Sequence, residues 1–143
     1  MPAPPSALEA ATAALARRDR SAADLVAYLE RRGSTPEDAA EAVERLEAAG
    51  YVDDARYARR RAEVLAERGY GDDGIRCELT REGVGAEESD AAVAELVPER
   101  ERAVAELRRA RSPRAAARRL ATKGFSADAI EAAATAVRLE PDA

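Results

Sequence analysis

The side chains of this chain that could do chemistry are arginines and carboxylates. Its 143 residues include 23 lysines and arginines and 28 aspartates and glutamates, but no histidine and a single cysteine, Cys77. Without histidine no Ser-His-Asp or Cys-His catalytic arrangement can form, and one cysteine provides neither a zinc-binding thiolate set nor a disulfide within the chain. A metal site would need carboxylates alone. We therefore expect a protein that is not an enzyme and that needs neither a metal nor a cofactor.

Three clusters of cationic side chains are candidates for binding a polyanion or an acidic protein surface. In the densest cluster, Arg56, Arg59 and Arg60 stand at i, i+3 and i+4, so their guanidinium groups share one face of a helix and could hold phosphates or carboxylates bidentately. The alternative for this cluster is pairing within the chain, with Glu63 or Glu67. The candidate binding residues are Arg17, Arg20, Arg56, Arg59, Arg60, Arg108, Arg109, Arg111, Arg114, Arg118, Arg119 and Lys123.

The charge of the chain is unevenly distributed. Residues 1–62 carry 10 basic and 11 acidic groups, residues 63–107 carry 5 and 13, and residues 108–143 carry 8 and 4. The C-terminal segment is therefore expected to lie nearest to phosphates, and the middle to be repelled by them. Asparagine and glutamine, which read base edges, are absent, and the few aromatic residues are expected mainly in the core. Any DNA contact should be to phosphates, depend strongly on salt and show little sequence preference.

The segments that must position these side chains are predicted to be helices. Thr35-Pro36 and Ser112-Pro113 each place an N-cap residue before a proline at the first helical position, and Ser21 begins a capping box. Glycines at 33, 50, 69, 83 and 124 fall just after the predicted helical stretches, where a positive φ can end a helix. The sequence predicts an all-α fold with helices at about 7–18, 22–32, 36–49, 54–68, 72–82, 86–97, 99–110, 113–123 and 127–138.

An internal repeat appears when three of the glycines are aligned. Gly33, Gly83 and Gly124 each follow a leucine by four residues, and each is followed by an apolar residue thirteen positions later. The pattern predicts tandem three-helix units, stacked into an elongated and curved body. We expect an N-terminal tail and leading helix at 1–18 and repeats at 19–69, 70–111 and 112–143, the last one lacking its third helix.

The most specific string in the sequence runs from Gly50 to Ala58 and reads GYVDDARYA. Gly50 is predicted to end one helix and Asp53 to cap the next, while Tyr51 and Tyr57 are expected in the core. Together with motif residues in segments 20–33, 68–83 and 118–130, this string resembles the RecX regulatory family over about residues 15–138.

The resemblance implies an all-helical protein of repeats similar to helix-turn-helix units that modulates the RecA recombinase. Such a protein binds the RecA filament on single-stranded DNA and commonly inhibits its recombinase and coprotease activities, within DNA repair, DNA recombination and the SOS response. The alternative is a stand-alone helix-turn-helix-like protein that acts on duplex DNA. The chain departs from the family pattern at Glu82 and at Asp72-Asp73, where basic or neutral residues are common, which argues against a DNA contact in the second repeat.

The remaining expectations concern location and assembly. No apolar run is long enough to span a membrane, and the first residues lack the basic start and the apolar run of a secretory signal. We expect a cytoplasmic, monomeric protein without a membrane partner.

Overall fold

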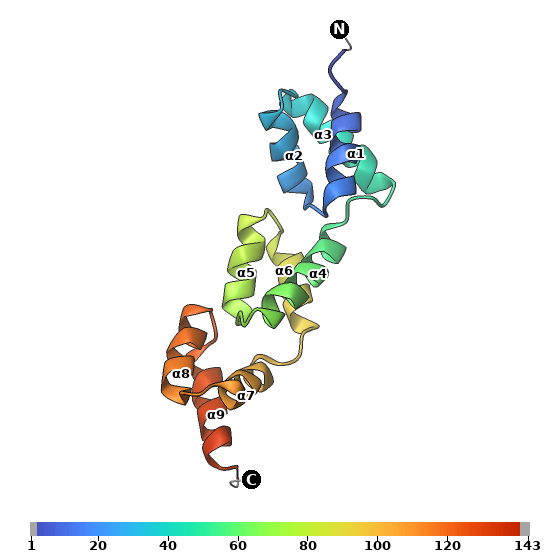
Figure 1. Cartoon of the computed structure of the whole chain (residues 1–143). Coiled ribbons are helices and arrows are strands. Elements are labelled where there is room, and N and C mark those ends of the chain that lie inside the picture. The colour runs from blue at the N-terminus through green and yellow to red at the C-terminus, as the bar shows by residue number, and fades with distance from the viewer. Residues whose placement is uncertain (1–2, 141–143) are drawn as a thin grey trace.

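The protein, analysed as a computed structural model, is built from helices alone over residues 3–140, the part of the chain that the structure describes (Figure 1). The prediction of an all-α fold is therefore confirmed for these residues. The helices are α1 (Ala7–Arg17), α2 (Ala22–Arg31), α3 (Pro36–Ala48), α4 (Asp54–Glu67), α5 (Asp72–Arg81), α6 (Ala86–Ala94), α7 (Glu99–Arg109), α8 (Pro113–Thr122) and α9 (Ala127–Arg138).

The expected start and stop signals act at the helix ends. The side chains of Ser21, Thr35, Asp53 and Ser112 each accept a hydrogen bond from a backbone N–H in the first turn, as N-caps do. The five glycines that follow helices all have a positive φ. Only α6 differs by as much as three residues, since it ends at Ala94 instead of 97. Pro98 explains the difference, because a proline disfavours helical geometry in the residue before it.

The buried side chains form three separate cores, each built by three consecutive helices. One core belongs to α1–α3, the second to α4–α6 and the third to α7–α9, which we call units 1, 2 and 3. This grouping differs from the expected repeats at 19–69, 70–111 and 112–143, which begin at the second helix of each unit. Helix α4 packs mainly against α6, and α7 packs mainly against α9. Each of these two helices therefore belongs with the two helices that follow it, and the third unit has three helices.

The second helix of each unit provides the apolar pair on which its core is built. Leu25 and Leu29 of α2 and Ile75 and Leu79 of α5 are fully buried, as the i, i+4 spacing predicts. In α8 the same positions hold Ala116 and Leu120, which are also buried. Alanines fill much of the remaining space, so the helices of a unit pack at short distance and the cores are small.

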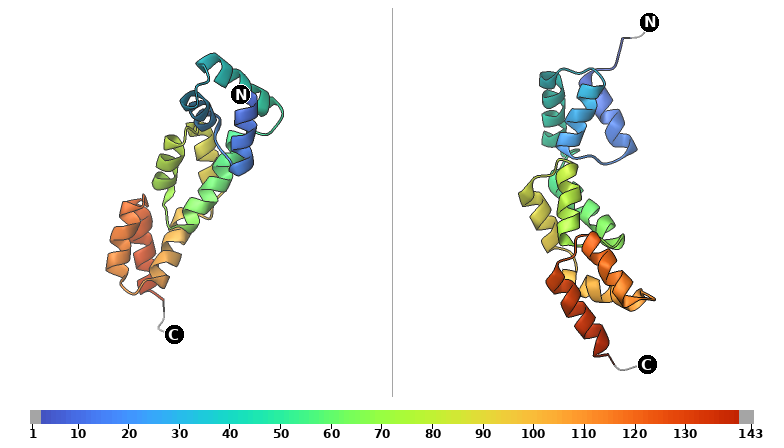
Figure 2. Two further views of the ribbon diagram at one scale, coloured as in Figure 1. Left: turned by 45° about the horizontal axis from the view of Figure 1, so that its top comes forward. Right: turned by 90° about the vertical axis from the view of Figure 1, so that its left-hand side faces the viewer.

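The three units follow one another along one axis, and the chain termini lie at opposite ends of the elongated body (Figures 1 and 2). Both joints between units use the same contact. The first N–H of α2, from Ala22, donates to Asp54 at 2.8 Å, and the first N–H of α5, from Asp72, donates to Glu99 at 3.1 Å. Asp54 and Glu99 are the first residues of the next unit. A carboxylate from each following unit therefore satisfies a helix start in the preceding one.

The joint between units 2 and 3 also brings two backbones into direct contact. Gly71, just before α5, donates its N–H to the carbonyl oxygen of Lys123 at 2.9 Å. A Cβ at Gly71 would lie 2.3 Å from the backbone nitrogen of Phe125, and a Cβ at Gly74 would lie 2.1 Å from the Lys123 oxygen. Only glycine at both positions allows this approach.

Tyr51 is an exception to the expected core. Its residue is 68% exposed, so the prediction that it fills the core is wrong, whereas Tyr57 is half-buried and Phe125 is buried. The neighbouring Val52 takes the buried place in the turn between α3 and α4 instead. The N–H groups of Tyr51 and Val52 both donate to the Leu46 carbonyl oxygen, at 2.9 and 3.3 Å, which holds this turn against the end of α3.

We predict that Gly71→Ala destabilises the protein by roughly 2 kcal/mol or more, because the added methyl group meets backbone atoms that cannot move without opening the joint. Urea unfolding followed by circular dichroism measures the change. Gly85→Ala is the matched control, since its Cβ meets only the movable carboxylate of Glu88. Equal stability of Gly71→Ala and the parent would contradict the backbone contact.

Candidate nucleic-acid and partner interface

Two of the candidate arginines contact Tyr28 of α2 in unit 1. Arg20 has a side chain only 10% exposed, pairs with Asp24 at 3.0 Å and stacks on the ring of Tyr28 at 4.4 Å. Arg17 donates to the hydroxyl of Tyr28 at 2.7 Å. Tyr28 therefore contacts both guanidinium groups. Because the Arg20 side chain is buried, it offers little surface to a partner.

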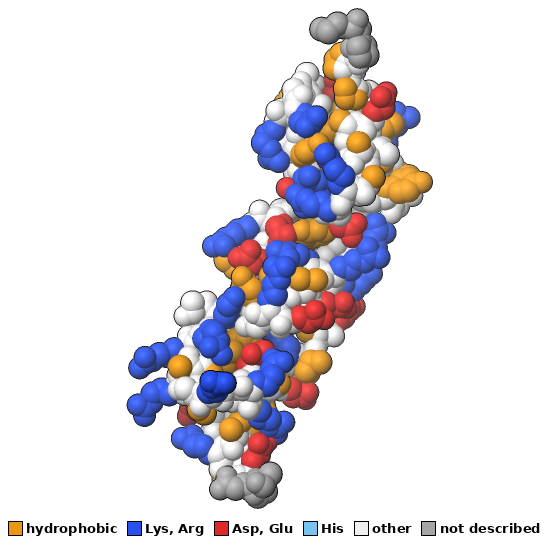
Figure 3. All heavy atoms as spheres, in the orientation of Figure 1, with side chains coloured by type: hydrophobic (Ala, Val, Ile, Leu, Met, Phe, Trp, Pro, Cys, Tyr) orange, Lys and Arg blue, Asp and Glu red, His pale blue; other side chains and the backbone are white. Residues whose placement is uncertain are grey.

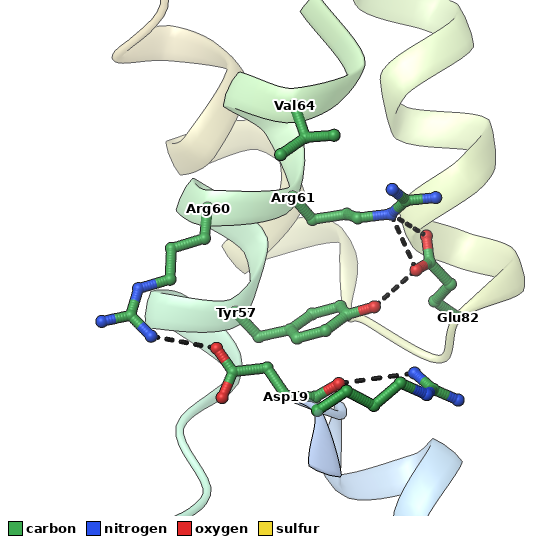
Figure 4. A pocket seen from close by; sticks show the side chains of 7 residues that line it. Asp19, Tyr57, Arg60, Arg61, Val64 and Glu82 are labelled. Atoms are coloured by element: carbon green, nitrogen blue, oxygen red, sulfur yellow. Dashed lines mark hydrogen bonds and ion pairs between the residues drawn. The ribbon is translucent and has the colours of Figure 1, made fainter.

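A polar pocket of about 380 Å³ opens at the joint between units 1 and 2 (Figure 4). Its residues come from the turn after α1, from α4 and from the end of α5: Arg18, Asp19, Tyr57, Arg60, Arg61, Val64 and Glu82. Figure 4 shows the Tyr57 hydroxyl and the Arg61 guanidinium converging on Glu82, with Arg60 directed at Asp19. The Arg61–Glu82 and Arg60–Asp19 pairs measure 3.0 and 2.9 Å.

Arg61 lines this pocket and is not among the candidate binding residues predicted from the sequence. It stands one turn after Tyr57 on α4, and this i, i+4 spacing indicates a shared face. Its acceptor, Glu82, lies 21 residues further along the chain, so the pairing itself has no local signal. Arg18 is the other cationic lining residue outside the predicted set; it pairs loosely with Asp24 at 3.6 Å.

The Arg56, Arg59 and Arg60 cluster does not present three free guanidinium groups on one face. Arg56 donates to the carbonyl oxygens of Gly50 and Tyr51 at 3.2 and 3.3 Å and so closes the turn before α4. Arg59 lies 3.9 Å from Glu95, and Arg60 pairs with Asp19 across the joint. Pairing within the chain therefore occurs, but its carboxylates come from other elements and not from Glu63 and Glu67 of the same helix.

The arginines near α8 fall into a paired and an unpaired group. Arg108 pairs with Glu140 and Arg109 with Glu106, both through charge-assisted hydrogen bonds. Four others are exposed, and within residues 3–140 their side chains make no hydrogen bond or ion pair: Arg111, Arg114, Arg118 and Arg119. Figure 3 shows basic side chains gathered over this end of the molecule. This group, which we call the α8 arginines, is the part of the predicted site most accessible to an anionic partner.

Two features of α8 set the geometry of this surface. The expected break at Ser112-Pro113 is present, so Arg111 lies in the linker before the helix while Arg114 and Arg118 share a face one turn apart. Lys123 places its Nζ 4.2 Å from the ring centre of Tyr70, which holds it at the joint.

Metal-binding and membrane-spanning features are both missing from the part of the chain that the structure describes. Among those residues no group of three or more histidine, cysteine or carboxylate side chains is arranged to hold a metal ion. None of their helices has the length and apolar character required to cross a membrane.

We predict that the Tyr57–Glu82 contact makes stability fall at alkaline pH. Burial and the hydrogen bond to Glu82 raise the pKa of Tyr57 above its ordinary value of 10.0. Because the pKa of Tyr57 is higher in the folded state than in the unfolded state, its contribution to the free energy of unfolding is complete below about pH 10. This contribution is lost as the pH rises toward the folded-state pKa. Urea unfolding between pH 9 and 11 should show a steeper loss for the parent than for Tyr57→Phe. Parallel losses would exclude a raised pKa at Tyr57.

Comparison with known proteins places the chain in a family. No family model matches it. Regulatory protein RecX of Stenotrophomonas maltophilia (strain R551-3) is 34% identical over 138 residues, which are 90% of this chain and 83% of that protein. Regulatory protein RecX of Xanthomonas campestris pv. campestris (strain B100) is 41% identical over 80 residues, 56% of this chain and 49% of that protein.

The fold is similar to that of a solved relative. The crystal structure of RecX from Lactobacillus salivarius superposes with a TM-score of 0.82 at 18% identity and covers 94% of this chain and 96% of that chain. The arrangement of helices is thus shared at low identity, and the sequence relationship over nine-tenths of the chain confirms the resemblance found from the motifs. The chain belongs to the RecX family of regulatory proteins.

Proposed function

We propose that this protein is a non-enzymatic cytoplasmic regulator that binds the RecA filament on single-stranded DNA and inhibits recombinase and coprotease activity. It acts as a monomer, and DNA repair, recombination and the SOS response are the processes it would affect. The observation that carries the proposal is the elongated shape of this member of the RecX family. Three units stacked along one axis form a body suited to contacting neighbouring subunits of a nucleoprotein helix.

The mechanism is occupancy of the filament. A rod bridging adjacent recombinase subunits would cover the groove used by incoming duplex or by proteins that undergo cleavage. The two joints hold the units in a fixed succession, so contacts made by unit 1 and by unit 3 act together as a bivalent attachment. Bivalent attachment raises affinity without requiring a strong contact in any single unit.

The α8 arginines are the residues that we assign to phosphates. The α8 arginines have no partner within residues 3–140, so they break no contact there on binding an anion, whereas Arg60 and Arg61 would first have to leave Asp19 and Glu82. Phosphate contacts release counterions, so binding should weaken as salt rises. Because the chain lacks asparagine and glutamine, little base preference is expected.

Purified protein added to a RecA strand-exchange and ATPase assay, from substoichiometric to stoichiometric amounts, tests the function. Inhibition that saturates with the number of filament sites is the expected result. Unchanged activity throughout would contradict the proposal. A gel shift on duplex DNA without recombinase separates it from the alternative of a stand-alone DNA-binding protein, for which tight and sequence-dependent binding is expected.

We predict that Arg114→Glu with Arg118→Glu weakens binding to the filament about tenfold or more. The salt dependence should also fall, by roughly 0.7 in log–log slope for each phosphate that the variant no longer binds. Fluorescence anisotropy of labelled filaments at several salt concentrations provides the measurement.

The matched control is Arg31→Glu with Arg45→Glu, which makes the same change in net charge at exposed positions of unit 1. Arg59→Glu with Arg60→Glu is expected to give an intermediate loss, since both side chains are already paired. Equal losses in the α8 and control variants would remove the α8 arginines from the site. Circular dichroism confirms that each variant keeps its helices.

A further inference from the structure

Shallow grooves recur between the first and third helices of all three units. Their volumes are about 310 Å³ in unit 1, 280 Å³ in unit 2 and 490 Å³ in unit 3. Each groove contains at least one alanine and at least two acidic residues. The lining residues place these grooves between α1 and α3, between α4 and α6 and between α7 and α9. Figure 1 shows α2, α5 and α8 along the other edge of the body.

The groove of unit 2 has the most developed apolar floor. Ala66 of α4 and Leu96 and Val97 after α6 lie within it, and Val97 is 57% exposed. The carbonyl oxygen of Val97 accepts a hydrogen bond from Arg102 at 2.8 Å, so this stretch of chain is held in place. The floor is therefore formed before any partner binds.

The rim of the same groove is acidic and largely unneutralised. Glu63 and Glu67 stand one turn apart on α4, both are exposed, and neither forms an ion pair within residues 3–140. Like charges at this spacing destabilise a helix. Glu95 faces them from the other side, and its nearest cation is Arg59 at 3.9 Å. The other lining cation, Arg102, is directed away from the rim, to Asp72 at 2.9 Å.

We infer that this groove binds a protein segment that presents an apolar side chain flanked by lysine or arginine, as one face of a basic amphipathic helix does. The apolar residue would cover Val97 and Leu96, and the cations would pair with Glu63, Glu67 and Glu95. Grooves between helices commonly accept such a helix through a few apolar anchors. The three glutamates repel phosphates, so charge favours a protein over a nucleic acid on this edge.

The inference goes beyond the proposed function, because it concerns the edge that lies away from the α8 arginines and needs no recombinase for its test. Together the two surfaces would let one rod contact phosphates with one edge and protein with the other. Unit 2 would then be a protein-binding unit, which agrees with its excess of carboxylates over residues 63–107.

The test is a titration of ¹⁵N-labelled protein with a synthetic amphipathic helical peptide of leucine and lysine, followed by amide chemical shifts. The expected shifts map to residues 63–67 and 92–97. Glu63→Lys with Glu67→Lys should weaken binding about tenfold or more. Val97→Ser, which leaves the charge unchanged at an exposed position, should weaken it about threefold or more.

The control variant is Glu30→Lys with Glu47→Lys, which changes the net charge equally at exposed positions outside the grooves. An equal loss in the control would reduce the effect to general attraction of charges and overturn the inference. Shifts confined to other surfaces would overturn it as well.

Two further arms exclude other occupants. A single-stranded oligonucleotide that shifts the same amides would point to nucleic acid and overturn the inference. Sedimentation of the parent and of the Glu63→Lys, Glu67→Lys variant tests whether a second copy of the chain occupies the groove. Self-association of the parent but not of the variant would show that it does, and would also overturn the inference. None of these results depends on RecA, so failure of the proposed function would be recognised separately in the strand-exchange assay.

Discussion

The contact on which the rest of the structure depends is the one between the start of a second helix and the unit that follows. Each unit has a small core that is rich in alanine. The contacts at the joints between units are what align the three units along one axis. At the joint between units 2 and 3 the backbones touch at Gly71 and Gly74, and no side chain could be placed between them. At the joint between units 1 and 2, Ser21 bonds the Glu82 carbonyl oxygen and Ala23 lies against Gly83. Close approach at both joints turns three small cores into one rod.

The joints also decide which arginines are available to a partner. Arg60 and Arg61 pair with carboxylates across or beside the first joint, and Arg102 is buried at the second, where it bonds Asp72 and two backbone oxygens. The α8 arginines lie in unit 3, away from both joints, and no carboxylate within residues 3–140 pairs with them. Arg109, by contrast, pairs with Glu106 of its own helix, so both local spacing and packing between elements decide which cations are paired.

Pro113 distinguishes the third unit from the first two. It occupies the position that Ala22 and Asp72 occupy in the first two units, the first residue of a second helix. Both of those residues donate an N–H to a carboxylate of the next unit, and proline has no N–H to donate. Arg114, which follows, corresponds to Ala23, whose small side chain accommodates Gly83. The third unit thus lacks the N–H through which each of the first two units binds a carboxylate of the following unit.

The sequence by itself determined the helices, because caps such as Thr35-Pro36, glycines with positive φ and i, i+4 pairs such as Leu25 and Leu29 act over one or two turns. It also identified the family, through the string from Gly50 to Ala58. Tertiary structure alone decided how helices group into units, that Tyr51 points outward, and which arginines are neutralised. The physical reason is range: Glu82 meets Tyr57 and Arg61 from another helix, and Asp19 meets Arg60 across a joint. Such pairings depend on how helices pack within a unit and how units stack, and the periodicity of a single helix carries no information about either.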